Sequence, residues 1–185
     1  MKKKISYILL TLAILSLTAC GNDDVKVIDN TQKEIETVTA GTGEAKDEET
    51  FADINSFSFS GTDIVIGEEV QPVAEKLGEP VNYFEAPSCA AQGISKTYTY
   101  DGFEINTTPS GDKDLIAAII VLSDTVNIPG DITIGSKAEA VKAAYGDNYN
   151  ESNGSITYEG GDVQLTFLVK DDVVTSIQYI SKSLN

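Results

Sequence analysis

Histidine and arginine are both missing from this chain of 185 residues, and cysteine occurs only twice. Without histidine, catalytic triads that use a histidine base and the usual zinc sites are excluded. Cys89 therefore has no histidine to activate it, and no basic cluster lies near it in the sequence. We expect no catalytic residue, no metal site and no cofactor, and we interpret the protein as non-enzymatic.

Acidic pairs are the remaining candidates for acid–base chemistry or cation binding. They are Glu68 with Glu69, Asp112 with Asp114, and Asp171 with Asp172. Each pair lies at an expected turn or helix start, where acidic side chains serve the local structure. An enzyme that uses carboxylates alone, such as a glycosidase, is therefore the least favoured alternative.

The charge of the chain also limits its partners. All thirteen basic residues are lysines and stand against 29 acidic residues, which gives a net charge of −16. Such an acidic surface repels nucleic acid and anionic lipid headgroups. We expect no nucleic-acid partner, whereas basic proteins or cations would be attracted; solubility alone would also account for the charge.

The first twenty residues have the organisation of a secretory signal. Three lysines at positions 2–4 precede the apolar stretch Ile5–Leu17, and Thr18, Ala19 and Cys20 follow. The apolar stretch is shorter than the ~20 residues of a membrane-spanning helix and suits a signal peptide. This segment resembles a bacterial lipobox, which implies removal of residues 1–19 and attachment of palmitate-type acyl chains to Cys20.

A protein with two or three acyl chains stays on the membrane. We therefore expect a lipoprotein on the outer face of the cell membrane of a Gram-positive bacterium, held through the lipid on Cys20. Cys89 is then left without an intramolecular partner, and its apolar neighbours predict that it is buried.

We expect residues 20–56 to comprise the lipidated cysteine and a disordered acidic tether. The segment after Cys20 has ten acidic residues and three lysines and is poor in aromatic residues. Such a composition buries too little surface to offset the entropy of ordering. A flexible tether of this length spans roughly 30–35 Å and lifts the folded part clear of the headgroups.

Two later segments of the chain are nearly alike, 68 residues apart. Residues 63–78 read DIVIGEEVQPVAEKLG, and residues 131–146 read DITIGSKAEAVKAAYG. In each, a short apolar run is followed by apolar residues at helical spacing, and Gly78 or Gly146 ends the predicted helix. In the second segment, Ser136 is the expected N-cap, with Glu139 completing a capping box.

Each predicted helix is followed by strand-like runs separated by turn residues, and Phe57–Ser60 alternates like a strand before the first helix. The expected strands are Ser95–Tyr100, Phe103–Thr108 and Leu115–Leu122, then Ser155–Tyr158, Val163–Val169 and Val174–Ile180. Asn153-Gly154 is a strong hairpin signal. The fold class expected is α+β, with one helix-plus-antiparallel-meander repeat over residues 57–130 and a second over residues 131–185.

The repeated phrase, an I-x-I-G motif followed by a helix and a meander, resembles the tandem repeat of β-lactamase inhibitory proteins. Ile64–Gly67 and Leu77–Pro80 carry the match in the first copy, and Ile132–Gly135 and Tyr145-Gly146 carry it in the second. The phrase is also similar to the repeat of small outer-membrane assembly lipoproteins. The loop at residues 85–93 resembles one in surface lipoproteins of gut Firmicutes.

This resemblance implies a curved sheet with helices on one face and a concave face open to a partner. It also implies an alternative function, inhibition of a secreted or surface hydrolase. The chain departs from the inhibitors, because their repeats contain disulfides and two helices, whereas one clear helix is expected in each copy here.

Strand alternation predicts which side chains lie on the open face. Val173, Thr175, Ile177 and Tyr179 are expected to pack under the helices. The opposite, polar set consists of Thr97, Thr99, Glu104, Asn106, Gln164, Thr166, Ser176 and Gln178. We expect this set to bind an unidentified protein or other envelope component, although a plain solvated face would have the same pattern.

Overall fold

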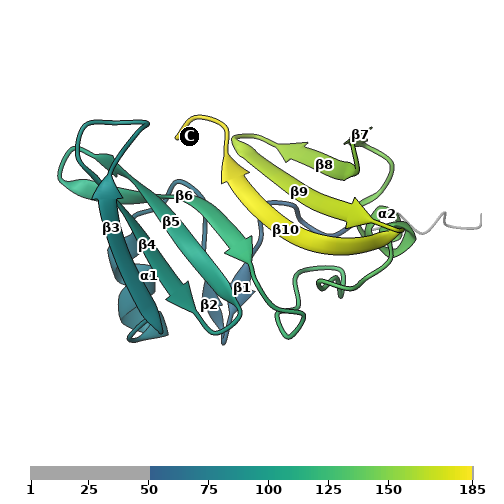
Figure 1. Cartoon of the computed structure of the whole chain (residues 1–185), viewed down its shortest axis with the longest axis horizontal. Coiled ribbons are helices and arrows are strands. Elements are labelled where there is room, and N and C mark those ends of the chain that lie inside the picture. The colour runs from purple at the N-terminus through teal and green to yellow at the C-terminus, as the bar shows by residue number, and fades with distance from the viewer. Residues whose placement is uncertain (1–50, 185) are drawn as a thin grey trace, which may run out of the picture. The chain divides into compact units, whose positions relative to one another are not determined.

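The structure is a computed structural model that describes residues 51–184. The signal peptide, Cys20 and residues 21–50 of the expected tether lie outside the described residues. The described part is an α+β structure with two short helices and a large antiparallel sheet (Figure 1). The helices are α1 (Val70–Leu77) and α2 (Ala138–Tyr145).

A two-stranded sheet precedes α1, and eight further strands form one antiparallel sheet. The small sheet pairs β1 (Ser58–Phe59) with β2 (Thr62–Asp63). The large sheet contains β3 (Asn82–Pro87), β4 (Ile94–Tyr100), β5 (Phe103–Ser110), β6 (Lys113–Val121), β7 (Tyr149–Ser152), β8 (Ser155–Gly160), β9 (Val163–Lys170) and β10 (Val173–Ser181).

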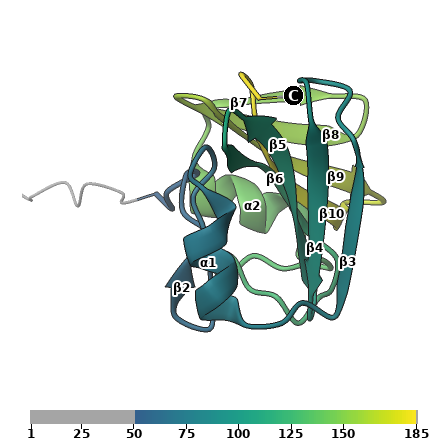
Figure 2. The same ribbon diagram turned by 90° about the vertical axis from the view of Figure 1, so that its left-hand side faces the viewer.

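The strand order is β3-β4-β5-β6-β10-β9-β8-β7, so each helix is followed in the chain by four consecutive antiparallel strands. The two groups of strands join through β6 and β10, which share the four pairs between Ala118–Val121 and Ile177–Ile180. Figure 1 shows the groups side by side, and Figure 2 shows that their strands run in very different directions. A right-handed twist between neighbouring strands gives a large sheet this form.

Both helices pack on the same face of the large sheet. Phe103 pairs with Val121, Val121 with Ile177, and Ile177 with Phe167. These four side chains therefore point to the same side of the sheet. The core on that side includes Val70 and Val73 of α1 and Val141 and Tyr145 of α2. Within residues 51–184, no helix covers the opposite face of the sheet.

Each helix ends as the sequence predicts. Gly78 and Gly146 have φ of 81° and donate their N–H groups to the carbonyls of Ala74 and Lys142. The predicted capping box of α2 is wrong, because the N-cap is Lys137 and makes no side-chain cap bond. The Ser136 hydroxyl is used one turn earlier, where it accepts a hydrogen bond from the N–H of Thr133 at 3.0 Å.

Phe57 fills the centre of the core, where the two groups of strands meet. Its side chain is only 2% exposed, and its ring lies 5.3 Å from that of Phe103 and 5.6 Å from that of Tyr179. Aromatic pairs at such distances add about 0.5–1.5 kcal/mol beyond the area that they bury. The segment just before β1 therefore helps to hold together strands that are far apart in the sequence.

Residues 51–56 also pack on the folded part, although the composition assigns them to the tether. The N–H of Ala52 donates to the carbonyl of Ala144 at 2.9 Å, and Ile54 packs beside Gly160. An added Cβ at Gly160 would lie 2.5 Å from Ile54 Cδ1, which accounts for a glycine there. Residues 51–56 thus belong to the folded part, which the sequence does not predict.

The expected β10 alternation is wrong at its start. Val174 is buried and Thr175 is exposed, because the β9–β10 register shifts between Val174 and Ser176. A bulge of this kind inserts one unpaired residue and reverses the faces on one side of it. From Ile177 to the end of the strand, the predicted faces are those observed.

Candidate functional site

The eight polar residues expected on the open face do share that face. Thr99 pairs with Glu104, Glu104 with Ile120, Ile120 with Gln178, and Gln178 with Thr166. Directly paired residues of neighbouring strands point to the same side. These five residues therefore form one row across β4, β5, β6, β10 and β9.

A second row lies next to the first, toward the other end of the strands. Thr97 pairs with Asn106, Asn106 with Ala118, Ala118 with Ile180, and Ile180 with Gln164. Ser176 lies on the same face, opposite Leu168. All eight predicted residues are partly exposed, as expected for a sheet face that neither α1 nor α2 covers.

Hydrogen bonds fix several of these side chains. Thr97 Oγ1 donates to Asn106 Oδ1 at 2.7 Å, and Asn106 Nδ2 donates to Glu104 Oε1 at 3.1 Å. Gln178 Nε2 donates to Ser176 Oγ at 3.2 Å. Side chains that are already ordered lose less entropy when they bind a partner. The face thus offers preorganised hydrogen-bonding groups on a rigid sheet.

Apolar side chains interrupt the polar rows, and the sequence reasoning missed them as part of the site. Ile120 and Ile180 are half-buried within the rows, and Leu168 is 40% exposed. Phe84, which is 60% exposed, pairs with Thr97 and so extends the same face onto β3. No sequence signal reveals Phe84, because polar and apolar residues are mixed on both faces of β3.

The β3 strand is not among the strands that the sequence predicts, and the expected loop at residues 85–93 begins inside it. It forms one edge of the large sheet, and five of its six residues are exposed. Tyr83 lies on the helix-bearing face, with its ring 4.9 Å from that of Tyr98. Partial burial, together with the hydrogen bond that its hydroxyl donates to Glu85, raises the pKa of Tyr83 above its ordinary value.

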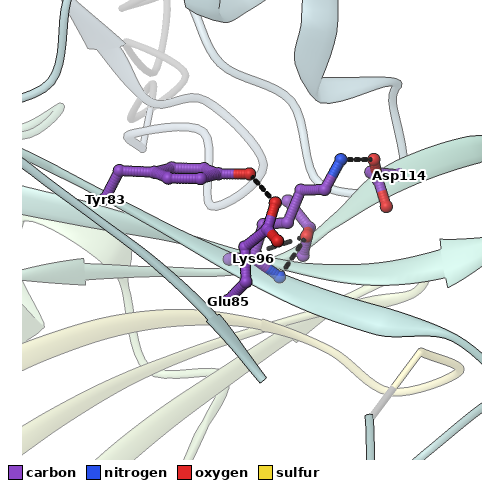
Figure 3. Close-up of polar contacts among 5 residues, drawn as sticks. Tyr83, Glu85, Lys96 and Asp114 are labelled. Carbon is purple, nitrogen blue, oxygen red and sulfur yellow. Dashed lines mark hydrogen bonds and ion pairs between the residues drawn. The ribbon is translucent and has the colours of Figure 1, made fainter. Parts of the chain in front are cut away.

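A charged hollow of about 330 Å³ lies on the helix-bearing face beside β3. Glu85, Lys96, Asp112 and Asp114 are among its lining residues. Lys96 Nζ lies 2.6 Å from Asp114 Oδ2, and this hydrogen bond raises the pKa of Lys96 (Figure 3). Within residues 51–184, neither Glu85 nor Asp112 forms an ion pair with a lysine.

Cys89 is exposed, so the prediction that it is buried is wrong. It lies in the loop that joins β3 to β4, beyond the end of the paired residues. The Ser88 hydroxyl accepts hydrogen bonds from the N–H groups of Ala90 and Ala91, which closes this loop on itself. Apolar neighbours in sequence do not bury a residue when the chain turns away from the sheet.

Two further observations concern metal binding and membrane spanning. In the described part of the chain, no group of three or more His, Cys, Asp or Glu side chains could hold a metal ion. Neither α1 nor α2 is long and apolar enough to cross a membrane, and residues 51–184 contain no other candidate.

Comparison with known proteins gives one distant similarity in structure. No protein-family model matches the chain, and no curated protein matches it. The chain is similar to an extracellular protein containing a SCP domain from Bacillus anthracis str. Ames, with 16% identity and a TM-score of 0.40. The match covers 69% of this chain and 48% of that protein, so the chain spans about half of its length.

Proposed function

We propose that this protein is a lipid-anchored, extracytoplasmic interaction module of the cell envelope, without enzymatic activity of its own. Support for the location comes from the sequence, in which a signal-like segment ends at Cys20 and an acidic stretch follows. The acyl chains would hold the protein on the outer face of the membrane, and the tether would carry the folded part outward.

We further infer that the folded part arose by duplication of a small α/β unit. The similarity of residues 63–78 to residues 131–146 supports this inference. So does the order of elements, in which each of these segments precedes four antiparallel strands. Two units joined through β6 and β10 give a sheet wide enough for a macromolecular partner.

The observation that carries the proposed function is the open sheet face. Two adjacent rows of polar and apolar side chains cross five strands there, and no helix of the described part of the chain covers them. Rigid strands hold the groups in fixed positions, and Ile120, Ile180 and Leu168 supply apolar surface between hydrogen-bonding groups. Protein interfaces combine the same features, an apolar centre with polar groups around it.

The test is a comparison of immobilised variants. The chain from residue 21 onward is held through an N-terminal tag in place of the lipid and exposed to solubilised envelope from the source organism. One variant combines Thr99→Arg with Gln178→Arg on the open face. The control combines Gln71→Arg with Ala143→Arg, two exposed positions on the helices that add the same charge.

We expect a partner that the unmodified protein and the control retain and that the open-face variant loses. Equal retention by all three would contradict the assignment of the open face. The absence of any retained partner, with the protein shown to be folded, would contradict an interaction function. If the retained partner is a hydrolase, an activity assay with stoichiometric protein tests the alternative of an inhibitor.

A further inference from the structure

The two edges of the large sheet differ in how they are protected. At one edge, β7 has four residues, and its Glu151 forms an ion pair with Lys142 at 2.8 Å. At the other edge, β3 has six residues in six regular pairs with β4. An edge strand presents unpaired backbone N–H and C=O groups to any chain that can lie beside it.

The β3 edge has few of the features that usually prevent such pairing, and Glu85 is its one charged side chain. Its sequence, Asn-Tyr-Phe-Glu-Ala-Pro, contains no lysine, and its only proline, Pro87, is the last residue. No bulge interrupts its register with β4. Proteins commonly protect an exposed edge with lysine, an internal proline or a bulge. The absence of these features leaves β3 competent to pair with an added strand.

Different side chains flank the two sides of this edge. Phe84 lies on the open-face side and is 60% exposed. Glu85 lies on the other side and lines the charged hollow together with Asp112. Neither carboxylate forms an ion pair with a lysine within the described residues, although Lys96, which pairs with Asp114, and Lys113 also line the hollow. An added strand would thus meet an apolar surface on one side and, on the other, a hollow in which three carboxylates outnumber two lysines.

We propose that β3 binds an extended peptide segment of a partner protein, in which apolar residues alternate with lysine or arginine. The peptide backbone would pair with the free edge of β3. Its apolar side chains would lie against Phe84, and its cationic side chains would lie over Glu85 and Asp112. Alternation meets both requirements because successive side chains of a strand point to opposite faces.

A second copy of this chain fits the edge less well. Residues 51–185 contain twenty acidic residues and seven lysines, so two copies repel one another. The proposal deepens the interaction function above by naming a class of partner, but its site is the β3 edge rather than the central polar rows.

The experiment uses short synthetic peptides and the ¹⁵N-labelled chain from residue 21 onward. The probe is an octapeptide of alternating lysine and valine with blocked termini. One control has the same composition in two blocks, and a second replaces each lysine with glutamate. A third is the alternating peptide with N-methyl groups on alternate amides, which removes the edge hydrogen bonds. Amide chemical shifts and hydrogen exchange report the binding site.

We expect the alternating lysine–valine peptide to shift the β3 amides and to slow their exchange with solvent. The three control peptides should bind at least ~10-fold more weakly, since each loses alternation, charge or backbone pairing. Glu85→Gln should weaken binding ~2–5-fold, the range of an exposed ion pair. The matched change Glu151→Gln at the β7 edge should leave binding unchanged, and Phe84→Ser should weaken it.

Several results would overturn the proposal. Equal binding of the block peptide would mean attraction by charge alone, and shifts confined to β7 or to the central rows would place the site elsewhere. No binding at millimolar peptide would also refute it, as would a dimer with protected β3 amides in the free protein. The single change Gln178→Arg lies on β10, separated from β3 by three strands, and should leave peptide binding unchanged, so this test and the test of the open face fail independently.

Discussion

Two buried tyrosines of the core should respond in opposite ways to removal of their hydroxyl groups. The Tyr158 side chain is 2% exposed, and its hydroxyl donates a hydrogen bond to the carbonyl of Gly146 at 3.0 Å. The Tyr100 side chain is 7% exposed, but its hydroxyl has no hydrogen-bond partner among residues 51–184. Phenylalanine retains the ring in each case and removes only the hydroxyl.

The expected magnitudes follow from what each hydroxyl contacts. Tyr158→Phe removes the donor from a buried carbonyl at the end of α2, which costs about 1–3 kcal/mol. Tyr100→Phe removes a hydroxyl that was desolvated on folding without a partner in return. Its effect on the free energy of unfolding should lie near zero or be stabilising by up to about 1 kcal/mol.

Urea unfolding at neutral pH, followed by near-ultraviolet circular dichroism of the tyrosines, measures both changes. The dependence of the free energy of unfolding on urea concentration serves as a control, and it should be the same in the parent and both variants because both variants keep the aromatic ring. In a folded part of this size, ~1 kcal/mol corresponds to ~3–5 °C in Tm, so thermal unfolding provides a second readout. If Tyr100→Phe proves as destabilising as Tyr158→Phe, the reasoning from hydrogen-bond partners is refuted.

Three further predictions test other parts of the structure. Burial raises the pKa of Tyr158 to about 12, so the folded state holds the phenol proton more tightly than the unfolded state. The free energy of unfolding should therefore be constant below pH 10 and fall between pH 10 and 12, and the Tyr158→Phe variant, unfolded in urea over the same pH range, should show a shallower fall. In urea unfolding, Gly102→Ala should destabilise the protein more than Gly61→Ala. Both glycines have positive φ, but of the two only Gly102 has a close neighbour, since an added Cβ there would lie 2.6 Å from Val126 Cγ2; equal destabilisation by the two changes would contradict this. The Cys89 thiol should react with a thiol reagent as fast in the native protein as in denaturant, and strong protection in the native state would show that its exposure is wrong.

The sequence predicts most of the large sheet and both helices because their signals are local. Gly78 and Gly146 end the helices with positive φ, a conformation that glycine adopts without strain. Asn153 and Gly154 both have positive φ in the two-residue turn between β7 and β8, as the hairpin signal predicts. The open face could be predicted for the same reason, since alternation alone assigns side chains to faces.

The errors arise where local patterns compete with a tertiary or loop feature. The Ser136 hydroxyl could cap α2 or close the preceding turn, and only the folded chain shows that it closes the turn. The bulge near Thr175 has no signal in the sequence, since every residue there is compatible with either face. Burial of Cys89 depends on where its loop projects, which its neighbours in sequence do not determine.

The absence of β3 from the predicted strands has a different cause, and it bears on the peptide site proposed above. Sequence patterns reveal strands through the contrast between a covered face and a solvated face, and a strand exposed on both faces lacks that contrast. Five of the six β3 residues are exposed, so Tyr83 and Phe84 look like parts of a loop. A protein that uses a sheet edge to bind another chain needs just such a strand, because its backbone and both faces must remain free. The strands that build this core therefore carry a clear signal in the sequence, whereas an edge strand that is free to take a partner carries almost none.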